Sequence, residues 1–199
     1  MFNWLKREPK ELIERRQALS PALVDYPLYQ PPDHPGPFLR RRDDQTEQDF
    51  MRYRDQYAAR SDENFIYFME QRATRVAALQ GFLDKFDVSA NLDDTGLANV
   101  SAWFADNSFA LVSSLRDEAL CQVYFRLQIP WIEELRGLNV IFDLGIFLGE
   151  SLIRKQPRLH WKYLPGISDH GECLCTGYQI AGFRQKGKGG WLEPASFVL

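Results

Sequence analysis

Cysteine is scarce in this 199-residue sequence, in which only Cys121, Cys173 and Cys175 are present. Three is an odd number, and the two closest cysteines are separated by one residue, which is a poor spacing for a disulfide. The scarcity excludes a disulfide-rich scaffold and favours a reducing compartment. We therefore expect a cytoplasmic protein.

Long apolar runs are also lacking. The first charged residue is already Lys6, so the N-terminal residues lack the apolar core of a signal peptide. The longest apolar stretch, Val140 to Leu148, is interrupted by Asp143 and is too short to cross a bilayer. We expect neither a leader nor a membrane span.

An excess of positive charge is absent as well. The chain has 24 Lys plus Arg against 27 Asp plus Glu, and residues 101–199 contain ten of each sign. Nucleic-acid and anionic-membrane binders usually carry a basic excess, so neither partner is expected. The 27 aromatic residues (14 Phe, 8 Tyr and 5 Trp) can instead fill a core without help from metals or disulfides.

Proline is concentrated near the N-terminus, where six of the eleven prolines lie between Pro21 and Pro37. Proline fixes φ and removes a hydrogen-bond donor, so this stretch is expected to be extended. Residues 1–19 before it have the pattern of a short amphipathic helix. We predict that residues 1–42 form an N-terminal helix and a proline-rich arm, and that residues 43–199 form a single domain.

Apolar residues at intervals of three and four predict several helices in the next part of the chain. Ser61 and Asp62 are suited to cap the second of them, which would separate it from the first. Four helices are expected between residues 43 and 138, around 50–57, 62–87, 97–104 and 109–127.

Residues 138–155 predict a central helix that is buried on most of its circumference. At 100° per residue, Asn139, Asp143, Glu150 and Arg154 fall within a strip about 60° wide, and nearly every other residue is apolar or Gly. A glycine in mid-helix costs about 1 kcal/mol relative to Ala. Gly145 and Gly149 are therefore expected where another backbone approaches closely.

After Pro157 the apolar period changes to two, which predicts strands. Leu159, Trp161 and Tyr163 alternate with Arg158, His160 and Lys162. A second strand is expected after Gly171 and a third over residues 191–199, with a Gly- and Lys-rich turn at 186–190 between them. The predicted fold class is α+β, with helices over 43–155 and a three-stranded antiparallel sheet over 158–199.

Three apparent ligand motifs are incomplete. Gly182 to Lys188 resembles a phosphate-binding loop, but Gly189 replaces the required hydroxyl and no helix follows. Residues 87–98 lack the glycine and the final Glu of a calcium loop. His170, Cys173 and Cys175, with Cys121 as an outside candidate, are weak metal-ligand candidates, because structural zinc sites rarely use Cys-x-Cys alone. No cofactor is expected.

Asp143 and Glu150 are the only pair suited to acid/base chemistry. Both lie on one face of the predicted central helix, separated along its axis by about 10 Å. One hypothesis is therefore a small hydrolase or ligand-binding enzyme that uses these two carboxylates. The alternative, which we favour, is structural, with Glu150 paired to Arg154 and Asp143 paired to Asn139.

Basic residues gather toward the C-terminus despite the acidic net charge. Such a face either protects a sheet from edge pairing or binds an acidic protein partner. The candidate binding residues are Arg154, Lys155, Arg158, His160, Lys162, Arg184, Lys186 and Lys188.

Residues 144–150 (Leu-Gly-Ile-Phe-Leu-Gly-Glu), 159–161 (Leu-His-Trp) and 178–183 (Tyr-x-Ile-x-Gly-Phe) resemble a pattern in small bacterial proteins of unassigned function. Those families share a Gly-x-x-x-Gly-Glu helix followed by a Trp-bearing strand and a short antiparallel sheet. The resemblance covers residues 72–199 and transfers no catalytic residue. Because some of those proteins are taken to be toxin-neutralising immunity proteins, it implies a bacterial cytosolic binding protein. We expect a non-catalytic protein that acts by contact with a protein partner.

Overall fold

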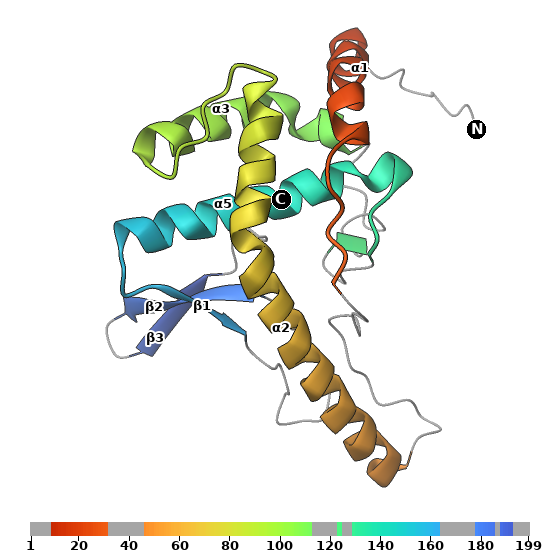
Figure 1. Cartoon of the computed structure of the whole chain (residues 1–199), viewed down its shortest axis with the longest axis vertical. Coiled ribbons are helices and arrows are strands. Elements are labelled where there is room, and N and C mark those ends of the chain that lie inside the picture. The colour runs from red at the N-terminus through yellow and green to blue at the C-terminus, as the bar shows by residue number, and fades with distance from the viewer. Residues whose placement is uncertain are drawn as a thin grey trace, which may run out of the picture.

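A computed structural model of the chain describes residues 9–31, 46–112, 123–124, 129–163, 178–185 and 188–192. This part of the chain is mostly helical and ends in a small antiparallel sheet (Figure 1), so the α+β class is confirmed. The elements in chain order are α1 (Lys10–Val24), α2 (Glu47–Asp84), α3 (Asp94–Leu111), the short 3-10 helix η1 (Glu133–Leu135), α5 (Gly137–Lys155), β1 (His160–Tyr163), β2 (Tyr178–Gln185) and β3 (Lys188–Leu192).

Helix α1 extends further toward the C-terminus than the helix predicted over residues 1–19. Regular structure was expected to stop before Pro21, but the helix continues through this proline to Val24. Leu19 and Ala22 lie on either side of Pro21 and are both buried. Because the burial of both residues requires the helical path, packing outweighs the hydrogen bond that proline removes.

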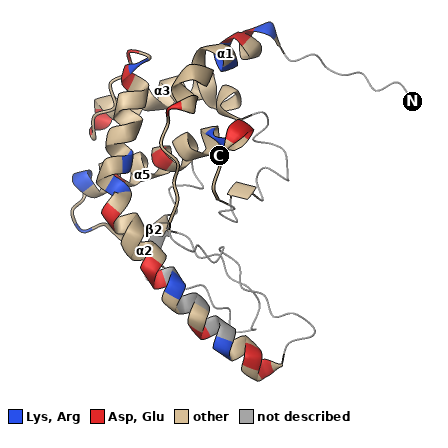
Figure 2. Cartoon of the chain, turned by 45° about the vertical axis from the view of Figure 1, so that its right-hand side comes forward, with Lys and Arg blue, Asp and Glu red and all other residues tan. Residues whose placement is uncertain are grey.

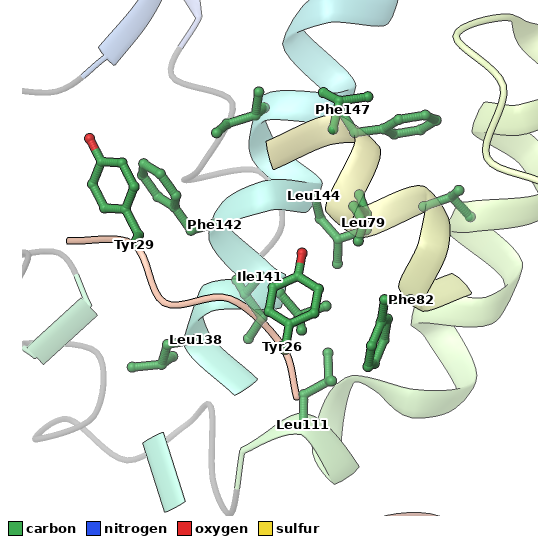
Figure 3. Packing of buried hydrophobic residues seen from close by; sticks show 14 of the residues in the cluster. Tyr26, Tyr29, Leu79, Phe82, Leu111, Leu138, Ile141, Phe142, Leu144 and Phe147 are labelled. Carbon is green, nitrogen blue, oxygen red and sulfur yellow. The ribbon is translucent and has the colours of Figure 1, made fainter. Parts of the chain in front are cut away.

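The segment from Asp25 to Pro31, here called the arm, has no regular secondary structure, as expected for its proline content. Its Tyr26 and Tyr29 are almost fully buried. Figure 3 shows both rings lying against α5 among apolar side chains of α2 and α5. The arm is therefore part of the core, while the remainder of the predicted proline-rich stretch lies outside the described residues.

Helix α2 is continuous over 38 residues, about 57 Å at 1.5 Å per residue. The predicted break at Ser61 and Asp62 is wrong. The N-cap is Thr46, whose hydroxyl accepts a hydrogen bond from the Asp49 amide. No Gly or Pro occurs between residues 47 and 80, so nothing in that stretch interrupts the helix.

The two halves of α2 have different environments. Its N-terminal half extends away from the other described elements and carries interspersed acidic and basic residues (Figures 1 and 2). Its C-terminal half packs into the core against α5. The buried apolar residues of this half are Phe68, Val76, Leu79, Phe82 and Leu83.

Helix α3 begins at the predicted acidic cap, where the Asp93 carboxylate accepts a hydrogen bond from the Gly96 amide at 2.8 Å. The helix extends to Leu111, so the predicted start of a separate helix at 109 is wrong. It ends because Val112 is extended (φ −141°, ψ 146°). The rest of the predicted 109–127 stripe, apart from residues 123 and 124, lies outside the described residues.

Helix α5 is the centre of the structure, and 13 of its 19 residues are buried. Helices α2 and α3 both pack against it. Figure 3 shows side chains of α5 meeting those of α2, α3 and the arm. The predicted central helix is confirmed. Among the described residues, no helix is both long and apolar enough to cross a bilayer.

Strand β1 shows the predicted alternation, because Leu159 and Trp161 are buried whereas His160 and Lys162 are exposed. The sheet order is β1-β2-β3 with antiparallel pairs, and Trp161 lies opposite Ile180. The buried face of the sheet packs on α5 through the Trp161 indole.

The other strand boundaries differ from the prediction. The described part of the second strand continues to Gln185, and the third begins at Lys188 inside the expected turn. Gly182 has φ +101° at a register shift between β2 and β3, and a Cβ there would lie 2.6 Å from the Arg158 carbonyl oxygen. This glycine accommodates the irregularity in the pairing of β2 with β3.

The close approach predicted at Gly149 is made by a side chain and not by a backbone. A Cβ on Gly149 would lie 2.3 Å from Cζ2 of the Trp161 indole. The ring therefore occupies the space above the helix that any larger residue would fill, which fixes β1 on α5.

Candidate functional site

The predicted polar strip of α5 passes from the interior to the surface. Asn139 and Asp143 are completely buried, Glu150 is partly exposed and Arg154 is exposed. The four residues therefore lie in different environments, and their partners come from other elements of the fold.

Asp143 is held by two donors from distant parts of the chain. Arg75 of α2 donates through Nε to Oδ1 at 2.8 Å, and the Tyr26 hydroxyl of the arm donates to Oδ2 at 2.5 Å. The Arg75 and Asp143 side chains are 5% and 0% exposed. The prediction that Asp143 pairs with Asn139 is wrong.

The burial of Asp143 changes its acidity. Removal from water raises the pKa of this carboxyl from 3.8 to about 6, against the opposing effects of the Arg75 charge and of the hydrogen bonds from Arg75 and Tyr26. Burial and the neighbouring carboxylate raise the pKa of Tyr26 well above its ordinary value. At neutral pH the tyrosine therefore keeps its proton and remains a donor.

Asn139 and Arg75 fasten the arm through its backbone. The Asn139 side chain accepts a hydrogen bond from the Tyr29 amide at 2.8 Å and donates to the Trp131 carbonyl at 2.9 Å. Arg75 Nη1 donates to the Pro27 carbonyl at 2.9 Å. Asn139 and Arg75 thus supply hydrogen-bond partners for buried backbone groups of the arm, which has no secondary structure to pair them.

Glu150 joins three elements. Its Oε1 accepts hydrogen bonds from Arg72 Nη1 of α2 at 2.6 Å and from Trp161 Nε1 of β1 at 2.7 Å. The predicted pairing with Arg154 is therefore wrong. The Arg72 and Glu150 side chains are 24% and 23% exposed, so this ion pair lies at the edge of the core.

This arrangement leaves the two carboxylates poorly placed for catalysis. Asp143 has no exposed surface, and each of its oxygens already accepts a hydrogen bond. Glu150 is restrained by a guanidinium and an indole. A general acid or base must come within hydrogen-bond reach of a substrate. The hydrolase hypothesis stays a prediction, and this geometry disfavours it.

The predicted basic residues do gather at the end of α5 and on β1. We call Arg154, Lys155, Arg158, His160 and Lys162 the basic edge, and all five are exposed. Lys155 pairs with Asp94 and Arg158 contacts the Gln156 side chain at 3.1 Å.

Among the described residues, the remaining members of the edge have no acidic partner, and the predicted extension of the edge is only partly described. Arg154, Arg158 and Lys162 pair with no acidic side chain in the described part of the chain. For Arg184 and Lys188 the structure places only the backbone, and Lys186 lies outside the described residues.

A hollow of about 730 Å³, which the sequence did not indicate, lies between α1, the end of α3, η1 and the start of α5. We call it the α1–α5 groove. Its lining is mainly apolar with charged residues among it, namely Arg16, Ser20, Leu23, Val24, Ala110, Leu111, Val112, Ile132, Glu133, Glu134, Arg136 and Gly137. No local pattern could have revealed it, because four separate segments build it.

The weak metal-ligand candidates His170, Cys173 and Cys175, and also Cys121, lie outside the described residues. Within the ranges that the structure does describe, no three His, Cys, Asp or Glu side chains are placed to hold a metal ion. A metal centre at those cysteines stays a weak prediction.

Comparison with known proteins adds no relative. No protein-family model, no curated protein and no solved structure matches this chain. The resemblance of residues 72–199 to small bacterial proteins therefore stays an expectation, and the function has to follow from the geometry described above.

Proposed function

We propose that this chain is a non-catalytic binding protein that contacts an acidic surface of a partner protein through its basic edge. The observation that carries the proposal is the grouping of exposed cations there. Arg154, Arg158 and Lys162 pair with no acid among the described residues. The sequence from 151 to 168 contains no Asp or Glu, so no local acid neutralises them.

The basic edge is built on a rigid support. Beneath it, Trp161 packs on Gly149 and donates to Glu150, which itself binds Arg72. These contacts hold the end of α5, β1 and α2 together. A surface whose backbone is already fixed loses little conformational freedom on binding, which favours its use as a docking surface.

Two structural explanations account for parts of the basic edge. Arg154 and Lys155 lie in the last turn of α5, where cations interact favourably with the helix dipole. His160 and Lys162 lie on a strand, where charge can discourage edge pairing. Neither explanation covers Arg158, which lies between the helix and the strand, so recognition of a partner is the simplest account of the whole group.

The roles of the interior carboxylates also support a non-catalytic protein. Asp143 and Glu150 have the partners of structural ion pairs and tie α5 to α2. The resemblance noted from the sequence implies the bacterial cytosol, where an immunity protein neutralises a toxin by direct contact. We propose this class of partner as the specific form of the binding function.

The proposal can be tested by mild cross-linking in the native host, followed by purification of the tagged chain. Three forms should be compared, namely the wild type, an edge variant and a control variant with the same change in net charge. The edge variant is Arg154→Gln, Arg158→Gln and Lys162→Gln. The control carries Lys10→Gln, Arg52→Gln and Lys85→Gln, which are exposed residues on α1, α2 and the end of α2.

An acidic partner is expected with the wild type and the control and should be lost with the edge variant. The affinity of the purified pair should fall by about tenfold in the edge variant and should weaken further with added salt. A partner that binds both variants equally, or the absence of any partner that depends on the edge, would contradict the proposal.

A further inference from the structure

We propose that the α1–α5 groove is a second docking surface, which receives a polypeptide segment of a partner that carries both apolar and basic side chains. The apolar side chains would enter the groove, and the Lys or Arg side chains would pair with Glu133 and Glu134. This inference does not depend on the basic edge, because none of the residues that form the groove belongs to that edge.

The apolar character of the groove is visible at both its floor and its rim. Ala110 and Leu111 are buried at the floor, whereas Val24 and Ile132 at the rim are 63% and 43% exposed. Single exposed apolar side chains are common on proteins and need no explanation. Here two large ones, from α1 and from the segment before η1, line the same mainly apolar hollow. Exposed apolar side chains gathered in this way mark docking sites.

The charges around the groove determine what it can receive. Its two arginines are engaged with backbone carbonyls, Arg136 with Val24 and Arg16 with Phe109. Glu133 and Glu134 are exposed and pair with no cation in the described part of the chain. Arg16 and Arg136 keep their positive charge but are only partly exposed, so the exposed charges at the groove are those of the two glutamates. Exposed carboxylates favour a cationic segment.

The backbone around the groove is fixed and locally strained. Glu133 has φ +49°, a left-handed conformation that is uncommon for any residue but glycine and that concentrates at functional sites. At the start of α5, a Cβ on Gly137 would lie 1.9 Å from the Leu111 carbonyl oxygen. This contact brings the end of α3 against the start of α5, so the floor of the groove is preformed.

The basic edge of a second copy of this chain is a poor occupant of the groove. The occupant has to present apolar and basic side chains together. The exposed cations of the basic edge have no exposed large apolar residue among them, because the described exposed apolar residues lie on α1, α2, α3 and before η1. The open rim also suits a segment with several side chains better than a small ligand, which needs to be enclosed.

The test uses the full chain as the target for a random linear peptide library. Peptides that are enriched should then be synthesised, and their affinities measured by fluorescence anisotropy. The groove variants are Ile132→Ser for the apolar rim and Glu133→Gln with Glu134→Gln for the charge. Matched controls on α2 are Ile66→Ser, at a site that is 58% exposed, and Glu63→Gln with Glu70→Gln.

Enriched peptides are expected to combine apolar residues with Lys or Arg. Ile132→Ser should weaken their binding by about tenfold, and the double Glu→Gln variant by about three- to tenfold, with little change in the controls. The proposal is overturned if the groove variants bind every enriched peptide as the wild type does, or if the groove-dependent peptides are acidic. It is also overturned if sedimentation shows a wild-type dimer that Ile132→Ser dissociates, because the groove would then belong to a second copy.

Discussion

Replacing Arg75 by Met would leave the buried Asp143 carboxylate without its cation. The substitution keeps most of the apolar volume of the side chain, but it removes the donor 2.8 Å from Oδ1 and the donor to the Pro27 carbonyl. The Arg75 guanidinium also lies 5.7 Å from the centre of the Tyr26 ring. The variant therefore loosens the arm and destabilises the charged form of Asp143 at the same time.

The size of the electrostatic loss is limited because the carboxyl can take up a proton. Its pKa in the wild type is about 6, so protonating it at pH 7 costs about one pKa unit, or about 1.4 kcal/mol. The unpaired Pro27 carbonyl adds about 1–2 kcal/mol. We expect Arg75→Met to lower the free energy of unfolding by about 3 kcal/mol at pH 7 and by about 1–2 kcal/mol at pH 5.

The assay is urea-induced unfolding of wild type and variant between pH 5 and pH 8, followed by circular dichroism. The matched control is Arg72→Met, whose partner Glu150 is partly exposed and keeps its bond from Trp161. Its loss should be about 1 kcal/mol or less and should vary little over this range. A destabilisation by Arg75→Met that does not grow between pH 5 and pH 8 would refute the reasoning about Asp143.

Three further predictions concern the same interior. The pKa of the Asp143 carboxyl is higher in the folded chain, about 6, than in the unfolded chain, about 3.8. Its contribution to stability is therefore complete below about pH 3.8 and falls by about 3 kcal/mol as the pH rises through 6. Asp143→Asn should remove this part of the pH dependence, as measured by urea titrations. Tyr26→Phe removes a donor to the carboxylate and should lower the unfolding free energy by about 1–3 kcal/mol. Gly149→Ala places a methyl group against the Trp161 ring and should lower the free energy of unfolding by about 1–3 kcal/mol. The control is Gly81→Ala, where no atom lies within 4 Å of the added Cβ. This control should raise the melting temperature and the free energy of unfolding, the latter by about 0.5–1 kcal/mol.

The elements predicted correctly from the sequence are those specified by local periodicity. The central helix around Asp143 and the alternation along β1 both follow from the spacing of apolar residues over a short window. The acidic cap at Asp93 is likewise a local signal. Such features depend on residues a few positions apart, so a single sequence suffices to find them.

The partners of the polar strip could not be predicted in the same way. Neighbours on the helix were expected as partners of Asp143 and Glu150. The actual donors lie 68 and 117 residues from Asp143, and 78 and 11 residues from Glu150. Pairing at these separations is set by how whole helices and the arm pack together. The same reason applies to the α1–α5 groove, which has no local sequence pattern.

Helices α1 and α2 are both continuous through residues that predict a helix end. Ser61 and Asp62 are good capping residues, and Pro21 is a helix breaker, yet both helices continue. A cap stabilises a helix end only where an end exists, and α2 has its cap at Thr46. Burial of residues on either side of Pro21 outweighs the lost hydrogen bond in α1.

Structural residues and proposed binding surfaces lie at different positions along α5, so one set of variants can test both binding proposals. The polar residues in the middle of the helix hold the arm and α2, whereas the basic edge and the α1–α5 groove lie at its opposite ends. If the structural residues and the binding surfaces are separate in this way, stability and binding should respond to different substitutions. Arg75→Met at pH 5, where the chain remains largely folded, should leave both affinities unchanged, and the edge and groove variants should leave the unfolding midpoint unchanged. Loss of binding in Arg75→Met while it is still folded would mean that the interior ion pair takes part in recognition, and the purely structural role given to the polar residues in the middle of α5 would be wrong.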